Sequence, residues 1–189
     1  MGNSASSGNP LQAVKNCETA KFMGTWFVIG VKPTAVETKN SNAVERYTWL
    51  ENKKHDIDID FQFNKGEPIT SKLSSLPQKG WVDNDDKTNS GRWKVSPVWP
   101  LKLPYLIIDV DVQDYKYAVI GYPSRAYAWL LYRHPQMPQD LYDRLTKELV
   151  EVHGYNLDGW RKVPQKWTAA EREKRGLSAE DIPDSMLEK

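Results

Sequence analysis

The chain has 189 residues, and its 26 Lys or Arg against 25 Asp or Glu leave a formal net charge of +1, so charge gives no reason to expect a nucleic-acid partner. The length suits one domain that can bury a core or wall a cavity. The single cysteine, Cys17, excludes an internal disulfide, and no apolar run is long enough for a transmembrane helix. We therefore expect a protein of a reducing, cytoplasmic compartment.

The first residues match a lipidation pattern. Once Met1 is removed, Gly2 and the serine at position 6 fit the signal for N-myristoylation. A flexible leader of small residues is the alternative interpretation. A single myristoyl chain holds a membrane only weakly, so stable attachment would need a second contact. Since the N-terminus also lacks the apolar run of a secretory signal, we expect residues 1–19 to be a flexible leader and the protein to be cytoplasmic, peripheral on a membrane if Gly2 is acylated.

The first predicted strand covers residues 24–30. Its period-2 alternation places Gly24, Trp26, Val28 and Gly30 on one face, which we expect to be the inner face of a sheet. Seven further segments predict strands, and none is followed by a helix before residue 138. About eight short antiparallel strands at regular spacing predict an up-and-down barrel. The further strands are expected at 44–50, 56–63, 78–82, 91–95, 105–112, 116–122 and in the stretch that ends at Arg133.

Three aspartates alternate with apolar residues in the third predicted strand. Asp56, Asp58 and Asp60 at a spacing of two could suggest a metal site, but on a strand they predict a solvated outer stripe. Residues 83–90 contain five aspartates or asparagines, yet lack the glycine and terminal glutamate of a calcium loop. We therefore expect no metal site.

Two proline-containing segments interrupt the strands. Residues 64–77 predict a long loop or irregular edge. Residues 96–104 combine prolines with large apolar side chains, and the prolines predict that this segment stays outside the sheet. Its exposed apolar groups need a surface to pack on. We predict membrane contact through Trp99, Leu101 and Leu103.

After Pro138 the hydrophobic period becomes that of a helix. Leu141, Leu145, Leu149 and Val152 fall on one stripe, and Gly154 ends the pattern. Residues 156–163 predict a short closing strand. From position 164 to 189 the chain is highly charged and predicts a loosely attached tail, with helix-start signals at Thr168 and Ser178.

Three short motifs occur in order along the chain: Gly24-x-Trp26, the Asp114-Tyr115 turn, and Arg133 near the end of the last predicted strand. Over residues 20–163 the chain resembles the lipocalin family, and within it the group of bacterial lipocalins, apolipoprotein D and plant temperature-induced lipocalins. The resemblance implies an eight-stranded antiparallel up-and-down barrel with one C-terminal α-helix packed outside. It also implies that the protein binds and carries a fatty acid, lysophospholipid or other lipid-like molecule, without a cofactor, in lipid storage, transport or stress protection.

Strand direction orients this barrel. If the first strand leaves a closed floor at Trp26, even-numbered strands return to it, so the eighth strand ends with Arg133 beside Trp26. A guanidinium over an indole is a favourable cation–π contact. The same rule places residues 33–42, 64–77, 96–104 and 123–125 at the open mouth.

Parity along the strands gives the residues expected to line the cavity. They are large and mostly apolar or aromatic, as suits a flat or acyl ligand. Glu45 is the one inward carboxylate, which we expect near the mouth. The predicted ligand-binding residues are Val28, Glu45, Tyr47, Trp49, Ile57, Ile59, Phe61, Trp93, Val95, Tyr117, Val119, Tyr127 and Trp129, with Gly30 on the same face.

Two other functions stay open. A lipocalin-type enzyme acting on an apolar substrate would need a nucleophile or an acid–base pair inside the barrel. Cys17 lies before the barrel and Glu45 has no evident partner, so we expect no catalytic residues and no enzyme. A scaffold with a filled core is the second alternative, and it predicts that apolar fluorophores do not bind.

Overall fold

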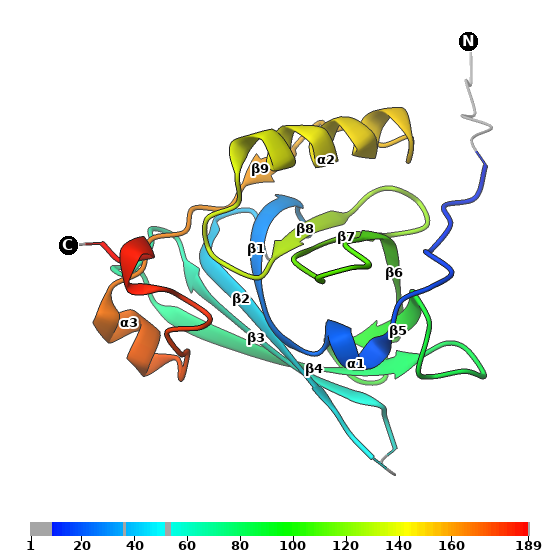
Figure 1. The fold of residues 1–189 in the computed structure, drawn as a ribbon, viewed down its shortest axis with the longest axis horizontal. Helices are drawn as coiled ribbons and strands as arrows, with labels where there is room; N and C mark the ends of the chain where they lie inside the picture. The colour runs from blue at the N-terminus through cyan, green and yellow to red at the C-terminus, as the bar shows by residue number, and fades with distance from the viewer. Residues whose placement is uncertain (1–8, 36, 52–53, 189) are drawn as a thin grey trace.

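Eight antiparallel strands close into a barrel in the computed structural model, which describes residues 9–35, 37–51 and 54–188. Each strand pairs with the next, and β1 pairs with both β2 and β8, which closes the sheet (Figure 1). The predicted barrel is confirmed. Its strands are β1 (Gly24–Lys32), β2 (Asn40–Trp49), β3 (Ile57–Lys65), β4 (Leu73–Val82), β5 (Arg92–Ser96), β6 (Leu103–Val110), β7 (Tyr117–Gly121) and β8 (Ala128–Tyr132).

In the described part of the chain, three α-helices and a ninth strand lie around the barrel. A short α1 (Thr19–Phe22) precedes β1, and α2 (Gln139–Glu151) follows β8. Next come β9 (Arg161–Lys162), which extends the sheet beside β1, α3 (Ala169–Lys174) and a 3₁₀ turn at Asp184–Met186. Among the described residues, no helix combines the length and apolar character needed to cross a bilayer.

Irregularities in the strands change which side chains face inward. In β1 the pairing with β8 shifts between Val28 and Gly30, so Val31 instead of Gly30 packs in the inner cluster. Gly30 lies on the outer face, where a Cβ atom would stand 2.5 Å from the ring of Trp160. The prediction that Gly30 lines the interior is therefore wrong, because a bulge reverses the alternation.

Pro77 and Pro104, which we expected to lie outside the strands, are both strand residues. Pro77 pairs with Asp60 in β4, in the part of that strand that has no partner on the β5 side. Pro104 is the second residue of β6 and faces Lys94. A strand edge and a strand start are the places where a missing N–H is tolerated.

The outer face of β6, β7 and β8 is covered by α2. Leu145 and Leu149 of the helix pack on Leu106, Val119 and Leu130, and these residues form a second apolar cluster outside the barrel. Figure 1 shows α2 lying across these strands. The predicted helix and its position outside the barrel agree with the structure, and of its predicted apolar stripe Leu145 and Leu149 are buried and Leu141 is half-buried. Val152 does not belong to the stripe, because it follows the last helical residue and is exposed.

The C-terminal segment is not a loose tail. Trp167, Leu177 and Ile182 are buried against the outer faces of β1 and β2. Thr168 caps α3 by accepting a hydrogen bond from the Glu171 backbone N–H at 3.2 Å, as the sequence predicts. Ser178 accepts hydrogen bonds in a turn, but no helix starts there.

The described part of the leader also packs on the barrel. Leu11 and Cys17 are buried, and the backbone N–H of Val14 donates to Ile107 O at 2.8 Å. Flexibility is therefore the wrong expectation for residues 9–19. Gly2, the predicted lipidation site, lies outside the described residues.

Candidate ligand-binding interior

One end of the barrel is sealed around Trp26. The Arg133 guanidinium carbon lies 3.7 Å from the centre of the indole, and the indole N–H donates to Phe22 O at 2.7 Å. The guanidinium also donates to carbonyl oxygens of Lys21, Thr25 and Tyr115 at 2.7 to 3.0 Å. Burial lowers the Arg133 pKa to about 10, so it remains charged at neutral pH. The sequence-predicted pairing of Arg133 with Trp26 is present.

The turn before β7 supports this sealed end. Tyr115 has a positive φ of 53°, and its hydroxyl accepts a hydrogen bond from the Glu18 backbone N–H at 2.8 Å. Asp114 pairs with Lys116 on the surface. The carboxylate that organises the turn is Asp111, which accepts three backbone N–H groups. We did not predict this role of Asp111 from the sequence, although an aspartate whose carboxylate accepts backbone N–H groups two to five residues later is typical of a turn.

Nine of the predicted ligand-binding residues belong to the inner cluster of the barrel or pack against it. Seven of them are buried members of this cluster: Val28, Tyr47, Ile57, Ile59, Phe61, Trp93 and Val95. Trp49 and Trp129 are half-buried and pack against it. Tyr127 precedes β8 and packs on Trp129, with ring centres 6.4 Å apart. The structure thus brings these side chains together, while their contact with a ligand remains a prediction.

Tyr117 and Val119 do not face the interior. Both belong to the cluster under α2, and the Arg144 guanidinium of that helix lies 5.4 Å from the Tyr117 ring. Their strand neighbours Ala118 and Ile120 fill the inner cluster instead. The prediction is wrong because β7 is apolar on both faces, and its alternation cannot show which face is inward.

Aromatic rings fill the interior next to the sealed end. Phe22, from α1, lies 5.0 Å from Trp26 and 4.9 Å from Trp93 between ring centres. Trp93 in turn stacks on Tyr105 at 5.7 Å and 12°. Phe22 and Tyr105 were not among the predicted lining residues. Tyr105 faces Trp93 across the β5–β6 pair, so its inward direction follows from hairpin register and not from its own alternation.

A buried polar cluster lies among these rings. Glu45 stands opposite Trp26 and Phe61 in the strand register, and its Oε2 accepts a hydrogen bond from the Tyr47 hydroxyl. Because Tyr47 donates its only proton to Glu45, the Tyr105 hydroxyl must donate to Tyr47, at 2.7 Å. Burial raises the Glu45 pKa to about 7. Glu45 therefore lies level with the floor tryptophan, not at the mouth as we expected.

Glu37, in the loop between β1 and β2, brings a second carboxylate to the open end. It is buried, and its Oε1 accepts the Trp129 indole N–H at 2.8 Å while its Oε2 accepts the Thr34 hydroxyl at 2.6 Å. Repulsion from Glu37 contributes to the raised pKa of Glu45. Glu37 was missed because the loop containing it shows no periodicity.

The inner face opens along β4. Its upper part, residues 73–78, pairs only with β3, and Leu76 and Gln78 on the inner face are half-buried. Leu103 and Tyr105 on β6 are half-buried as well. The exposed inner side chains therefore gather beside β4 and the start of β6, away from the floor.

The loop between β5 and β6 presents apolar side chains to solvent. Val98, Trp99 and Leu101 are exposed by 66, 66 and 53 %. Lys102 Nζ lies 4.0 Å from the Trp81 ring centre, next to Trp99. Leu103, predicted to belong to this exposed set, instead begins β6 opposite Val95 and is half-buried on the inner face.

Other polar groups have structural partners. Asp56 is buried and accepts the Val82 backbone N–H and the Lys87 ammonium, so the predicted solvated stripe is wrong at this one position. Asp58 is exposed and pairs with His55.

The only cysteine, Cys17, is buried. Burial raises the pKa of its thiol to about 12, which keeps it protonated and unreactive. Within the described ranges, no group of three or more His, Cys, Asp or Glu is arranged to hold a metal ion.

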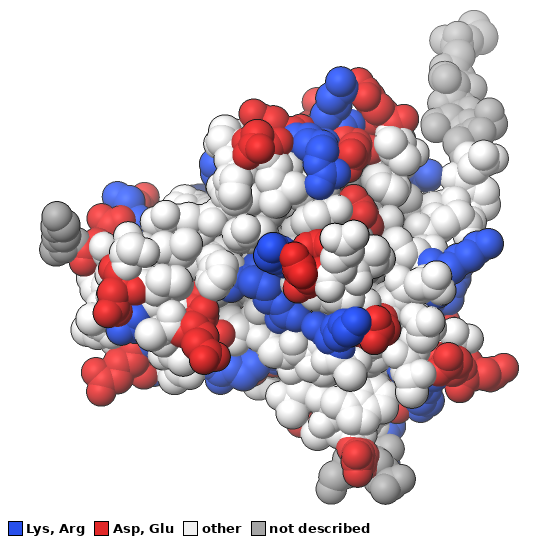
Figure 2. Space-filling view, in the orientation of Figure 1, with Lys and Arg blue, Asp and Glu red and all other residues white. Residues whose placement is uncertain are grey.

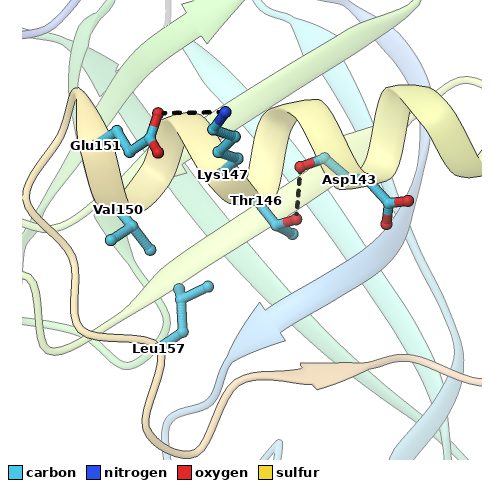
Figure 3. A pocket seen from close by; sticks show the side chains of 6 residues that line it. All are labelled: Asp143, Thr146, Lys147, Val150, Glu151 and Leu157. Carbon is cyan, nitrogen blue, oxygen red and sulfur yellow. Dashed lines mark hydrogen bonds and ion pairs between the residues drawn. The ribbon is translucent and has the colours of Figure 1, made fainter.

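A groove of about 410 Å³ lies outside the barrel, between α2 and residue 157. Val150 and Leu157 form its apolar part, and the ion pair of Lys147 with Glu151 crosses its rim at 3.8 Å (Figure 3). Both signs of charge are interspersed over the face shown in Figure 2. The groove is shallow and contains none of the predicted site residues, so the candidate site remains the barrel interior.

Comparisons with known proteins agree with this geometry. A family model described as a lipocalin-like domain matches residues 17–165. Temperature-induced lipocalin-1 of Arabidopsis thaliana is 28% identical over 173 residues, covering 85% of this chain and 86% of that protein. The outer membrane lipoprotein Blc of Citrobacter freundii is 26% identical over 145 residues, covering 74% and 77%.

Solved structures show the same fold. Insecticyanin from the tobacco hornworm Manduca sexta superimposes with a TM-score of 0.60 at 17% identity, covering 85% of this chain and 86% of that one. The cockroach allergen Per a 4 gives a TM-score of 0.58 at 15% identity, covering 82% and 92%. Lipocalins bind small hydrophobic ligands and are generally binding or transport proteins. With the family model matching most of its length and the barrel closed over Trp26 and Arg133, the chain belongs to the lipocalin family.

Proposed function

We propose that this protein binds a small apolar or amphiphilic molecule of the lipid class inside the barrel and carries it, without catalysing a reaction. The observation that supports this most is the inner face itself. It is closed at one end by Trp26 and Arg133, lined by apolar and aromatic side chains, and half-exposed along β4 and the start of β6. A ligand entering there would meet apolar surface first and the buried polar cluster last.

Binding is testable with a neutral apolar fluorophore such as diphenylhexatriene. Leu76 packs on the inner cluster beside the opening, while the adjacent Ser75 is exposed on the outer face. Leu76→Arg places a charge among the apolar lining and should weaken binding at least about tenfold, because an unpaired charge in an apolar site costs far more than 1.4 kcal/mol.

The matched variant Ser75→Arg adds the same charge outside the barrel and should bind as the wild type does. Absence of binding to the wild-type protein would contradict the proposal and favour a scaffold with a filled core. Equal binding by both variants would place the fluorophore elsewhere on the molecule.

We also propose that the protein works at a membrane surface. The support is the exposed set Val98, Trp99 and Leu101 with Lys102 beside it, since aromatic and basic side chains together favour the membrane interface. One relative's name, outer membrane lipoprotein, refers to a membrane. N-myristoylation at Gly2 would supply the second contact.

Vesicle flotation tests the membrane proposal. Trp99→Ser should reduce the fraction of protein that floats with anionic vesicles, because it removes the largest exposed apolar group of the loop. Val112→Ser is the matched control, since Val112 is 57 % exposed but lies in the turn after β6, toward the sealed end. If the two variants float equally well, the loop is not the membrane contact.

A further inference from the structure

The inner face holds one carboxylate with an unused acceptor. Glu45 Oε2 accepts the Tyr47 hydroxyl, whereas Oε1 accepts no hydrogen bond from any described residue. In the described part of the chain, the buried side-chain polar atoms without a partner are Asn40 Nδ2, Ser96 Oγ and Arg175 Nε. Glu45 Oε1 is not among these atoms, so it keeps some solvent contact, although the residue as a whole is buried at 8 % exposure.

Nearby cations are engaged elsewhere. The Arg133 guanidinium lies over Trp26 and donates to four backbone carbonyls of the floor. Arg161, at the open end, donates to the carbonyls of Glu37 and Asn40. Glu45 forms no ion pair with any described residue.

A second negative group stands above the first. The Glu37 carboxylate accepts the Trp129 indole N–H near the mouth, and its negative charge acts on Glu45, whose pKa it helps to raise. The hydroxyls of Tyr47 and Tyr105 form a relay whose last proton points at Glu45, so this relay supports a negative charge there. An anionic head group would meet two carboxylates, while an ammonium or hydroxyl would find a free acceptor.

We infer that the barrel selects its ligand by head-group charge, taking an apolar molecule with an amine or other donor head group, placed at Glu45 Oε1, in preference to the corresponding carboxylate. This inference rests on the proposed function and narrows it. Among the ligands that the family resemblance implies, it disfavours the free fatty-acid anion. A charge pair formed in a desolvated site is stronger than the same pair in water, so one buried carboxylate suffices for the preference.

Three ligands with the same ten-carbon chain test the inference. Decylamine, decanol and decanoate displace diphenylhexatriene from the full-length protein at about pH 8, where the amine and the acid are both charged. We expect decylamine to bind at least about tenfold more tightly than decanoate, with decanol between them. In Glu45→Gln the ratio of amine to acid affinity should fall to within about threefold.

Asp60→Asn is the matched control. It removes a carboxylate from the outer face of β3, where Asp60 bonds to Gln62 and Ser75, and it should keep the wild-type ratio of amine to acid affinity.

The pH dependence of this ratio in the wild-type protein provides a second test that needs no variant. At about pH 5.5 Glu45 is protonated, so the ratio should also narrow there. The groups facing Glu45 are Tyr47 on its own strand, Tyr105 from β6 and Glu37 from the mouth loop, with uncharged Trp26 and Phe61 beside it.

The outcomes separate the two proposals. If decanol binds and decanoate binds as tightly as decylamine, the charge selection is wrong and the carrier function stands. If the preference for the amine persists in Glu45→Gln, Glu45 is not its origin and the inference is overturned. If none of the three ligands displaces the fluorophore and the fluorophore itself does not bind, the carrier function fails and charge selection fails with it.

Discussion

At the scale of single residues, Arg133 and Glu45 are two buried charges with opposite surroundings. Arg133 has its charge satisfied by the Trp26 ring and by floor carbonyls, so it stabilises the closed end. Glu45 has one phenol partner and no ion pair with a described residue, so its charged form is poorly stabilised. The first residue therefore contributes to stability, and the second is the one that we propose to contact the head group of a ligand.

Arg133→Ala should lower the free energy of unfolding by about 2–4 kcal/mol, because it removes the cation–π contact and leaves buried carbonyls without donors. Urea denaturation followed by tryptophan fluorescence measures this. Arg92→Ala, at an exposed position on β5, should change stability by less than about 0.5 kcal/mol. Equal stabilities of the wild type and Arg133→Ala would mean that the floor is not held by this pair.

Glu45 should make stability depend on pH. Burial raises its pKa to about 7 in the folded state from the ordinary value of 4.5, so the folded protein binds more protons than the unfolded chain between these values. The free energy of unfolding therefore falls as the pH rises from about 4.5 to about 7, by about 3 kcal/mol from this group. In Glu45→Gln, which keeps the acceptor for Tyr47, that part of the pH dependence should vanish. An identical dependence in both proteins, from denaturation at several pH values, would refute this.

At the scale of elements, sequence periodicity is informative where one face of a strand is solvated. In β3 the aspartates alternate with Ile57, Ile59 and Phe61, and all three apolar residues do lie inside the barrel. In β7 both faces are apolar because α2 covers the outer one, so parity alone misplaces Tyr117 and Val119. In β1 a bulge that leaves no mark in the sequence reverses the alternation before Gly30.

The C-terminal segment is a second case in which the sequence pattern does not predict which side chains are buried. Its high charge predicts a solvated tail, yet Trp167 packs edge-on against Phe27 at 5.6 Å and under the Arg175 guanidinium. Arg175 is itself buried and donates to Asn42 O at 2.8 Å. A few apolar anchors and one buried arginine outweigh the average composition, because docking depends on the buried groups alone.

Trp167→Ala should destabilise the protein by about 3–5 kcal/mol, the usual cost of truncating a large buried aromatic side chain. Lys166→Ala, at the exposed neighbouring position, should leave the unfolding midpoint nearly unchanged. Thermal unfolding of the two variants measures the difference. If both variants unfolded at the wild-type temperature, the C-terminal segment would not stabilise the barrel, and this prediction would be wrong.

At the scale of the whole molecule, the closed end, the strand order and the outer helix could be predicted because short motifs and turn spacing record them. The polar cluster could not, since Tyr105 and Glu37 reach Glu45 only through register and loop packing across the barrel. The molecule is a barrel whose floor is held by Arg133, whose outer faces are covered by α2 and the C-terminal segment, and whose inner face is the candidate carrier site.

Native mass spectrometry of the protein purified without detergent from its own source tests this account most directly. We expect one small apolar molecule per chain, removed by organic extraction and replaced when decanol is added, and a mass shift at the N-terminal peptide if Gly2 is myristoylated. A spectrum that shows the bare chain both before and after incubation with decanol would contradict the claim that the barrel is a carrier.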